Sequence, residues 1–115
     1  MNYPINEMPV QAEMADLSTA GSAYAVAPRR GKIVRVFSVI KAAITVADAV
    51  WTMKINGAAV TGVSVTVAFT GAAAGDVDSA IAAIPVSEGD TIEFVSDGAS
   101  TTTAPTTFTA IIREG

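Results

Sequence analysis

The amino-acid sequence predicts an all-β protein, a single-domain jelly-roll β-sandwich of about eight strands preceded by an extended N-terminal arm. The first reason is a series of short runs rich in Val, Ile and Thr, which Gly, Pro, Asn and Asp interrupt at regular intervals. The second is that no segment shows sustained helical periodicity. The third is a length of 115 residues, which suits one domain with its own core.

The expected strands are short runs whose apolar residues alternate or occupy both faces. The run at 32–41 is apolar on both faces, which indicates a central strand or a strand with one face in an intermolecular contact. Asn56-Gly57 is the strongest hairpin signal, because both positions tolerate a positive φ. The expected strands are residues 23–27, 32–41, 50–55, 58–60, 63–69, 77–84, 91–96 and 106–113.

A jelly roll is favoured over an immunoglobulin-like sandwich. The Cys…Trp…Cys framework of immunoglobulin domains is absent, and a long crossing between residues 41 and 50 suits two Greek keys. Two sheets that pack face to face should bury the large apolar side chains between them. The expected members of this core are Phe37, Trp51, Val65, Phe69, Phe94 and Phe108.

The start of the chain differs from the rest, and we expect an N-terminal arm over residues 1–20 and a jelly-roll domain over residues 21–115. The first part contains Pro4 and Pro9 and few β-branched residues. A short strand is expected somewhere within residues 11–17, although the apolar residues of this stretch also have the spacing of one helix face.

The composition argues against catalysis and against several kinds of ligand. The chain has no histidine and no cysteine, so it lacks the commonest general base, a thiolate nucleophile and the usual ligands of zinc. We therefore expect no enzyme activity, no cofactor and no metal site. A net charge of −4 argues against nucleic-acid binding, and no apolar segment is long enough to span a membrane. The N-terminal sequence lacks the features of a cleaved leader, so synthesis in a cytoplasm is expected.

Several charged residues allow both a functional and a structural interpretation. The loop aspartates could form a calcium site, but aspartates also begin β-turns by accepting hydrogen bonds from their own backbone. They are Asp76 and Asp78, with Asp90 and Asp97 elsewhere. A carboxylate pair from Glu88, Asp90 and Glu93 could serve glycoside hydrolysis, although such enzymes are normally much larger. The adjacent Arg29 and Arg30 could bind an acidic partner surface or lie in a solvated turn.

Five turn motifs carry a resemblance to a known family. They are Pro-Arg-Arg-Gly-Lys-Ile at 28–33, Lys-Ile-Asn-Gly at 54–57, Ala-Gly-Asp-Val-Asp at 74–78, Glu-Gly-Asp-Thr-Ile-Glu at 88–93 and Ser-Asp-Gly at 96–98. In this order the motifs resemble the small jelly-roll proteins that decorate the heads of tailed bacteriophages, also called capsid cement proteins. The resemblance covers roughly residues 17–113, and turn motifs are more specific for a fold than for a role.

The resemblance implies a non-enzymatic virion structural protein that binds the outer surface of a bacteriophage capsid and stabilises it. The implied partners are the major capsid protein and other copies of the chain, as a homotrimer in preference to a dimer. The implied location is the outer capsid surface of the virion, after synthesis in the host cytoplasm. In such proteins an N-terminal arm often reaches onto the capsid. The candidate capsid contacts are Tyr3, Pro4, Ile5, Met8, Pro9, Arg29 and Arg30.

The alternative is a receptor- or carbohydrate-binding β-sandwich module of a phage fibre, because related jelly rolls also occur there. Such a module needs an exposed aromatic residue or an acidic loop site. Trp51 and Tyr24 are the aromatic residues to consider. Trp51 shares its strand phase with Met53 and Ile55, which favours a place in the core over a platform for a sugar.

Overall fold

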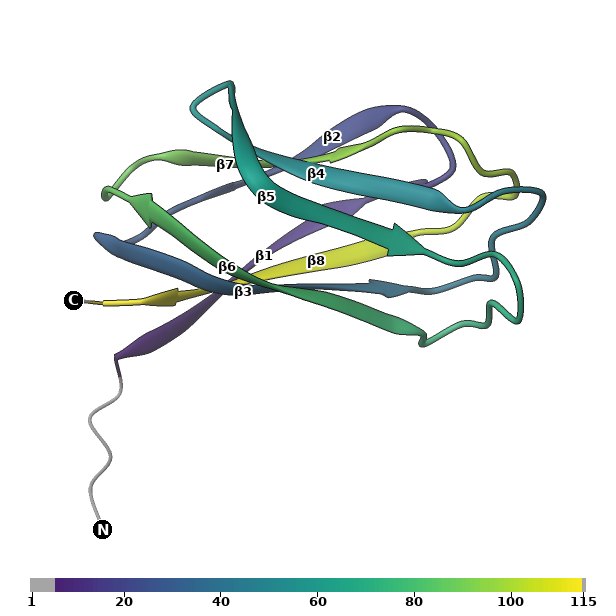
Figure 1. The fold of residues 1–115 in the computed structure, drawn as a ribbon, viewed down its shortest axis with the longest axis horizontal. Coiled ribbons are helices and arrows are strands. Elements are labelled where there is room, and N and C mark those ends of the chain that lie inside the picture. The colour runs from purple at the N-terminus through teal and green to yellow at the C-terminus, as the bar shows by residue number, and fades with distance from the viewer. Residues whose placement is uncertain (1–5, 115) are drawn as a thin grey trace, which may run out of the picture.

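The computed structural model describes residues 6–114, which form strands joined by turns and loops (Figure 1). The eight strands are divided between two four-stranded antiparallel sheets that pack face to face. No helix occurs among residues 6–114, so none in this part of the chain could cross a membrane. The strands are β1 (Glu7–Met14), β2 (Gly21–Val26), β3 (Gly31–Ile40), β4 (Ala49–Ile55), β5 (Ala58–Val67), β6 (Val77–Val86), β7 (Thr91–Ser96) and β8 (Thr106–Arg113).

The strand order identifies the fold as a jelly roll. Sheet A has the order β1-β8-β3-β6, and sheet B has the order β2-β7-β4-β5. Every neighbouring pair is antiparallel, and consecutive strands cross from one sheet to the other except at the β4–β5 hairpin. Two interleaved Greek keys of this kind make the eight-stranded jelly roll. The fold class predicted from the sequence is therefore confirmed.

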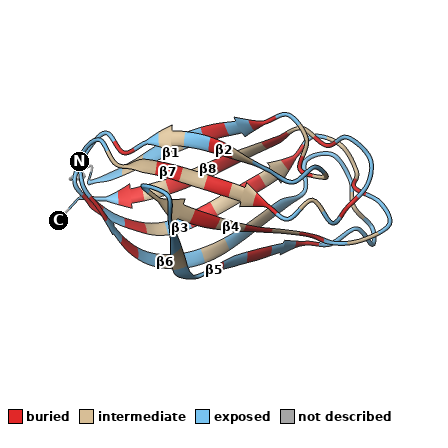
Figure 2. Ribbon diagram, turned by 90° about the horizontal axis from the view of Figure 1, so that it is seen from above, coloured by how far each residue is buried: buried red, intermediate tan, exposed pale blue. Residues whose placement is uncertain are grey.

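The core lies between the two sheets and is built around three aromatic rings. Trp51 of β4, Phe94 of β7 and Phe108 of β8 are fully buried. The indole ring meets both phenyl rings edge-on, with centroids 5.8 and 5.0 Å away, and the phenyl rings stack at 4.9 Å. The indole Nε1 donates a hydrogen bond of 3.1 Å to the Ser38 hydroxyl, so its polar atom has a buried partner. Figure 2 shows that buried residues occur on strands of both sheets, as a shared core requires.

Phe37 and Phe69 are the two expected core residues that lie outside the core. The register of β3 against both of its neighbours shifts around Val34, which marks a β-bulge. The bulge reverses the phase of β3, so that Val36 is buried and Phe37 lies on the outer side of the sheet. Phe69 follows the end of β5 and is 40% exposed. The other expected core residues are buried as predicted: Trp51, Val65, Phe94 and Phe108.

The described residues do not form the N-terminal arm expected over residues 1–20. Glu7–Met14 is an edge strand of sheet A that pairs with β8 along its whole length. Leu17 is fully buried, so the chain already contributes to the core before residue 20. The arm was expected partly because of Pro9, since proline is excluded from central strands. Proline is tolerated on an edge strand such as β1. Residues 1–5 lie outside the described part of the chain.

The hairpin between β4 and β5 turns at Asn56-Gly57, as predicted, with φ values of 51° and 84°. β5 then runs without interruption through Gly62, where the sequence predicted two separate strands. Gly62 has a φ of 93° and lies where the register of β5 against β4 shifts, so it marks an irregularity within the strand. β6 continues through Pro85, beyond the expected end at residue 84, and proline is tolerated there because β6 is an edge strand of sheet A.

Candidate functional site

The outer face of sheet B carries an exposed tyrosine among polar side chains. Tyr24 of β2 lies opposite Glu93 of β7, and Glu93 lies opposite Lys54 of β4, so the three residues form one row across the sheet. Tyr24 is 62% exposed, and the other two residues are half-buried. Each alternates with more deeply buried residues of its strand, which places the row on the solvent side of the sheet.

A second row beside this one adds hydroxyl groups. Ser22 and Thr52 both lie opposite Val95, and Thr52 lies opposite Ser64 on β5. The Ser22 hydroxyl donates a hydrogen bond of 2.5 Å to Oε2 of Glu93, which fixes the orientation of this carboxylate. A carboxylate has several acceptor positions, so Glu93 can accept further hydrogen bonds from a ligand. The two rows thus offer an aromatic ring, an oriented acceptor and a cation on neighbouring strands.

The sequence analysis recognised only part of this face. Tyr24 was considered as an aromatic binding residue, and Glu93 only as a catalytic carboxylate. Lys54 lies between Met53 and Ile55 in the sequence, but nothing in the sequence placed it in the same row as Tyr24. The register between β2, β7 and β4 makes this connection, and it depends on strand pairing that a single sequence does not show.

Trp51 cannot stack on an external ligand, because its ring is fully buried. The interpretation of Trp51 as a core residue is therefore confirmed. Of the two aromatic residues considered for ligand binding, the fold exposes Tyr24.

Some of the expected capsid contacts come together at the end of the sandwich where β1 begins and β8 ends (Figure 1). Met8, Pro9 and Arg29 contribute to the lining of a shallow depression of about 250 Å³. Arg29 also forms an ion pair of 2.8 Å with Glu114, and Arg30 lines a neighbouring hollow. The structure thus brings together residues that lie about 20 positions apart in the sequence. Outside the described residues lie Tyr3, Pro4 and Ile5.

The loop aspartates stabilise turns of the backbone. Asp90 accepts hydrogen bonds from the backbone N–H of Ser87 at 2.7 Å and from the amide of Asn56 at 3.0 Å, and both lower its pKa. Asp76 accepts a hydrogen bond of 2.9 Å from a backbone N–H three residues earlier. Burial, and after it the charge of Asp76, raises the pKa of Asp78. Residues 6–114 contain no group of three or more His, Cys, Asp or Glu side chains that could hold a metal ion.

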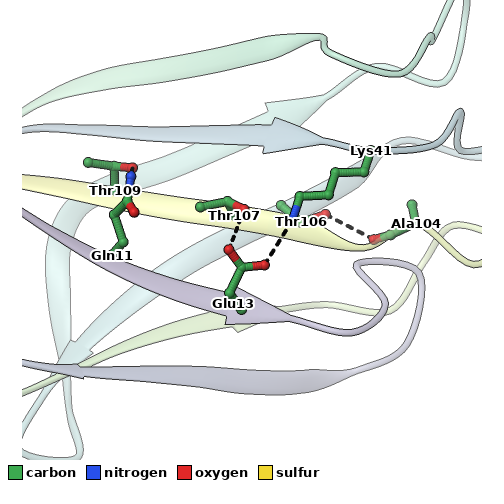
Figure 3. A network of polar contacts seen from close by, with 7 residues as sticks. All are labelled: Gln11, Glu13, Lys41, Ala104, Thr106, Thr107 and Thr109. Atoms are coloured by element: carbon green, nitrogen blue, oxygen red, sulfur yellow. Dashed lines mark hydrogen bonds and ion pairs between the residues drawn. The ribbon is translucent and has the colours of Figure 1, made fainter.

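A polar network on the outer face of sheet A links the edge strand β1 to β8 and to Lys41, which follows β3 (Figure 3). Glu13 accepts hydrogen bonds from the Thr107 hydroxyl at 2.7 Å and from Nζ of Lys41 at 3.0 Å. The Thr107 hydroxyl, and after it Lys41, lowers the pKa of Glu13. Gln11 adds a long hydrogen bond of 3.4 Å to Thr109 on the neighbouring strand. These groups satisfy one another, so the network stabilises the sheet edge.

Comparisons with known proteins agree with the fold. No protein-family profile matches the chain, and no curated protein matches it. The solved structure of Xyl-CBM35 in complex with a glucuronic acid-containing disaccharide is 14% identical with a TM-score of 0.55, over 85% of this chain and 74% of that chain. CBM35 from Cellvibrio japonicus Abf62 is 12% identical with a TM-score of 0.55, over 95% of this chain and 98% of that chain.

A third similar structure is the catalytic unit of a GH87 α-1,3-glucanase from Streptomyces thermodiastaticus. It is 14% identical with a TM-score of 0.58, and the alignment covers 99% of this chain but 27% of the glucanase unit. At these identities the likeness shows the fold alone. The jelly roll implied by the resemblance to phage decoration proteins is therefore confirmed. The two CBM35 structures are carbohydrate-binding modules, and none of the three is a capsid protein.

Proposed function

We propose that the chain is a non-enzymatic carbohydrate-binding β-sandwich module and that the outer face of sheet B is its binding site. The observation that carries this proposal is the exposed ring of Tyr24 in one row with Glu93 and Lys54. The likeness in fold to carbohydrate-binding modules supports it. The absence of histidine and cysteine supports a role in binding over a role in catalysis.

The chemistry of the face suits a sugar. A pyranose ring has an apolar face of C–H groups, which can stack on the flat ring of Tyr24, while its hydroxyl groups point outward around the ring. Glu93 can accept hydrogen bonds from these hydroxyls, and Lys54 can donate to them. The cation also suits a sugar that carries a carboxylate, because such a charge-assisted hydrogen bond is stronger than a neutral one.

The backbone of the site and the Glu93 carboxylate are positioned before the ligand arrives. All three residues of the row lie on strands, and the Ser22 hydroxyl already holds the Glu93 carboxylate. A side chain that is fixed in advance loses less conformational entropy when it binds a ligand. The face is open, so the site should bind an extended chain of sugars at its surface.

The test is isothermal titration calorimetry against a panel of neutral and uronic acid-containing polysaccharides. Tyr24→Ala should lower the affinity for the polysaccharide that binds best by about tenfold or more, because the stacking surface is lost. Tyr24→Phe should retain most of the affinity. The control is Val46→Ala in the loop between β3 and β4, an exposed position outside both sheet faces, which should bind like the unchanged protein. Fluorescence of the buried Trp51 is a poor reporter of this site.

Two results would contradict the carbohydrate proposal. One is that no polysaccharide of the panel binds to the folded protein. The other is that Tyr24→Ala binds as well as the unchanged protein, which would place any sugar site elsewhere on the molecule.

Capsid decoration is a second candidate function, because the fold gathers Met8, Pro9 and Arg29 around one depression. In this proposal the depression binds the major capsid protein on the outer surface of the virion. Copies repeated around a closed shell would gain from avidity, so each contact can be weak. Co-sedimentation with expanded, undecorated capsids should then show a saturable ratio of copies to capsid subunits. Met8→Asp should reduce this ratio, and failure of the folded protein to sediment would exclude decoration of those capsids.

A further inference from the structure

The outer face of sheet A carries a group of apolar side chains in and beside its central row. Strand register places its outward residues in rows across β1, β8, β3 and β6. The central row holds Phe37 and Ser79, with Gln11 and Thr109 on the other two strands. Two of the most exposed large apolar side chains among the described residues flank this row on β6: Ile81 is 75% exposed and Val77 is 62% exposed.

Aliphatic residues lie on both sides of the row of Phe37, and on β6 they are symmetric about it, with Ile81 on one side and Val77 on the other. On one side, Ile81 and Ile111 lie in the row of Arg35. On the other side, Val77 and Val39 lie in one row with Thr107. Each neighbouring row therefore contributes two aliphatic side chains to the same patch. A surface that is symmetric about one line can match a copy of itself across a twofold axis along that line.

The face also contains a hollow beside its protruding residues. A recess of about 630 Å³ lies where the bulge at Val34 interrupts the face. Its lining is mixed: apolar residues that include Phe37, Ile81 and Ile111 line it together with the charged Glu7, Arg35 and Arg113. The guanidinium of Arg35 lies 6.0 Å from the centroid of the Phe37 ring. Val77 protrudes two rows away from Ile81 on the same strand. A second copy that faces this sheet with its strands reversed in direction would therefore direct its Val77 toward the recess.

We propose that two copies of the chain associate through the outer faces of sheet A, with a twofold axis along the row of Phe37 and Ser79. This axis runs across the strands, so it sets Phe37 against Phe37 and Ile81 against Val77 of the partner copy. An axis parallel to the strands would set Val77 against Glu13 and Arg113 against Lys32. The first arrangement sets the aliphatic Ile81 and Val77 against each other, although it also sets Arg35 against Val39. The second sets Val77 against a carboxylate and brings two cations together.

The size of the face sets the strength of this association. Four strands at ~4.8 Å spacing and about eight residues at ~3.3 Å each give about 500 Å² per copy. Stable interfaces commonly bury about 800 Å² per partner, so this dimer should be reversible and depend on concentration. The charged groups nearest the rim already have partners within one copy, as Glu7 does with Arg113 and Glu13 with Lys41. They can therefore remain paired and solvated when the dimer forms.

The first experiment is sedimentation velocity with the full chain at concentrations from about 5 μM to about 500 μM, a range suited to a reversible interface. The expected mass rises from 11.7 kDa to twice this value. Ile81→Lys should remain a monomer throughout. The matched control is Val26→Lys, which changes an exposed aliphatic residue on an edge strand of sheet B and should still form dimers. Both sites are exposed, so neither variant should unfold the chain.

The second experiment tests the direction of the axis. The chain has no cysteine, so Ser79→Cys introduces a single thiol on the proposed axis. A bis-maleimide reagent with a span of about 10 Å, the usual distance between packed sheets, should join two such copies efficiently. Ser64→Cys is the matched control, because Ser64 is also an exposed serine on an edge strand, but of sheet B. Adding Ile81→Lys to Ser79→Cys should abolish the cross-link.

The proposal does not depend on the carbohydrate site and can fail separately from it. A monomeric mass at every concentration would overturn it, as would a dimer or trimer that Ile81→Lys leaves intact. A trimer would also need two different contact surfaces in each copy, which this single symmetric patch does not supply. Equal cross-linking of Ser79→Cys and Ser64→Cys would overturn the proposed axis.

Discussion

The two outer faces of the sandwich have the same backbone architecture but differ in the side chains that they expose. On sheet A the row of Phe37 and the two rows beside it carry an outward group of apolar side chains, with Phe37 and the highly exposed Ile81 among them. On sheet B the corresponding positions hold Tyr24, Glu93 and Lys54. The inward residues of both sheets form one apolar core. The comparison teaches that the inward half of each strand specifies the fold, while the outward half is free to specify different contacts on each side.

A single irregularity contributes to this difference. Without the bulge at Val34, an uninterrupted β3 would direct Phe37 toward the core along with Ile33. The bulge keeps Ile33 and Val36 buried and moves Phe37 to the outside. Bulges commonly redirect a side chain in this way. The outward position of Phe37 thus depends on one extra residue in one strand.

The largest expected effect removes the core that both faces share. Trp51→Ala should lower the free energy of unfolding by about 3–5 kcal/mol, because it leaves a cavity between the sheets and removes the partner of the buried Ser38 hydroxyl. Chemical denaturation followed by circular dichroism measures this change. The variant should weaken the properties of both faces together. Tyr24→Ala is the control and should change stability by less than about 0.5 kcal/mol, since its side chain is exposed.

An intermediate effect should separate the two sheets. A methyl group added at Gly31 would collide with the backbone carbonyl of Arg113, so Gly31→Ala should destabilise the protein by about 1–3 kcal/mol and displace β3 from β8. The proposed self-association through sheet A should weaken, while sugar binding on sheet B should persist. Gly21→Ala on β2 is the matched control, because its methyl group would meet only the Thr19 carbonyl oxygen at 3.9 Å. Equal loss of stability in both variants would contradict the assigned close approach.

The smallest expected effect concerns the connection between the sheets and depends on pH. Asp16 lies between β1 and β2; burial raises its pKa, but hydrogen bonds from the Ala104 N–H, the Thr19 hydroxyl and the Ser18 N–H outweigh burial and lower it. A lowered pKa stabilises the folded state above the ordinary value of 3.8, and this stabilisation disappears as pH falls through the folded value. Asp16→Ala should therefore cost about 1–2 kcal/mol at neutral pH.

The same variant should differ little from the unchanged protein at strongly acidic pH, where Asp16 is protonated in both the folded and the unfolded state. Unfolding curves in urea between neutral pH and pH of about 2 measure this convergence. A difference in stability that stays constant over the whole range would show that the charge of Asp16 does not matter.

The sequence predicted most of the strands because their signals are local. Thr91–Ser96 and Thr106–Arg113 have the bounds that alternation and flanking turn residues indicated. Asn56-Gly57 turns where its tolerance of positive φ required. These features depend on neighbouring residues, so a single sequence contains the information needed to place them.

The errors arose where pairing between distant strands decides the outcome. Pro9 and Pro85 lie within strands because those strands are at the edges of sheet A, and edge position is a property of the whole fold. The bulge at Val34 depends on the register with β8 and β6. The row of Tyr24, Glu93 and Lys54 likewise exists only once three strands are aligned. Local patterns therefore predicted the core better than they predicted the candidate site.

The pairing of β1 with β8 also determines how the molecule should respond to mechanical force. Glu7 and Arg113 face each other at the same end of sheet A, and the backbone N–H of Glu114 donates a hydrogen bond of 2.7 Å to the Asn6 carbonyl. A pull on the two ends of the described chain loads these first contacts before any others. The hydrogen bonds between β1 and β8 then break one pair at a time. Extension in this direction should peel β1 away at low force, although the aromatic core is densely packed.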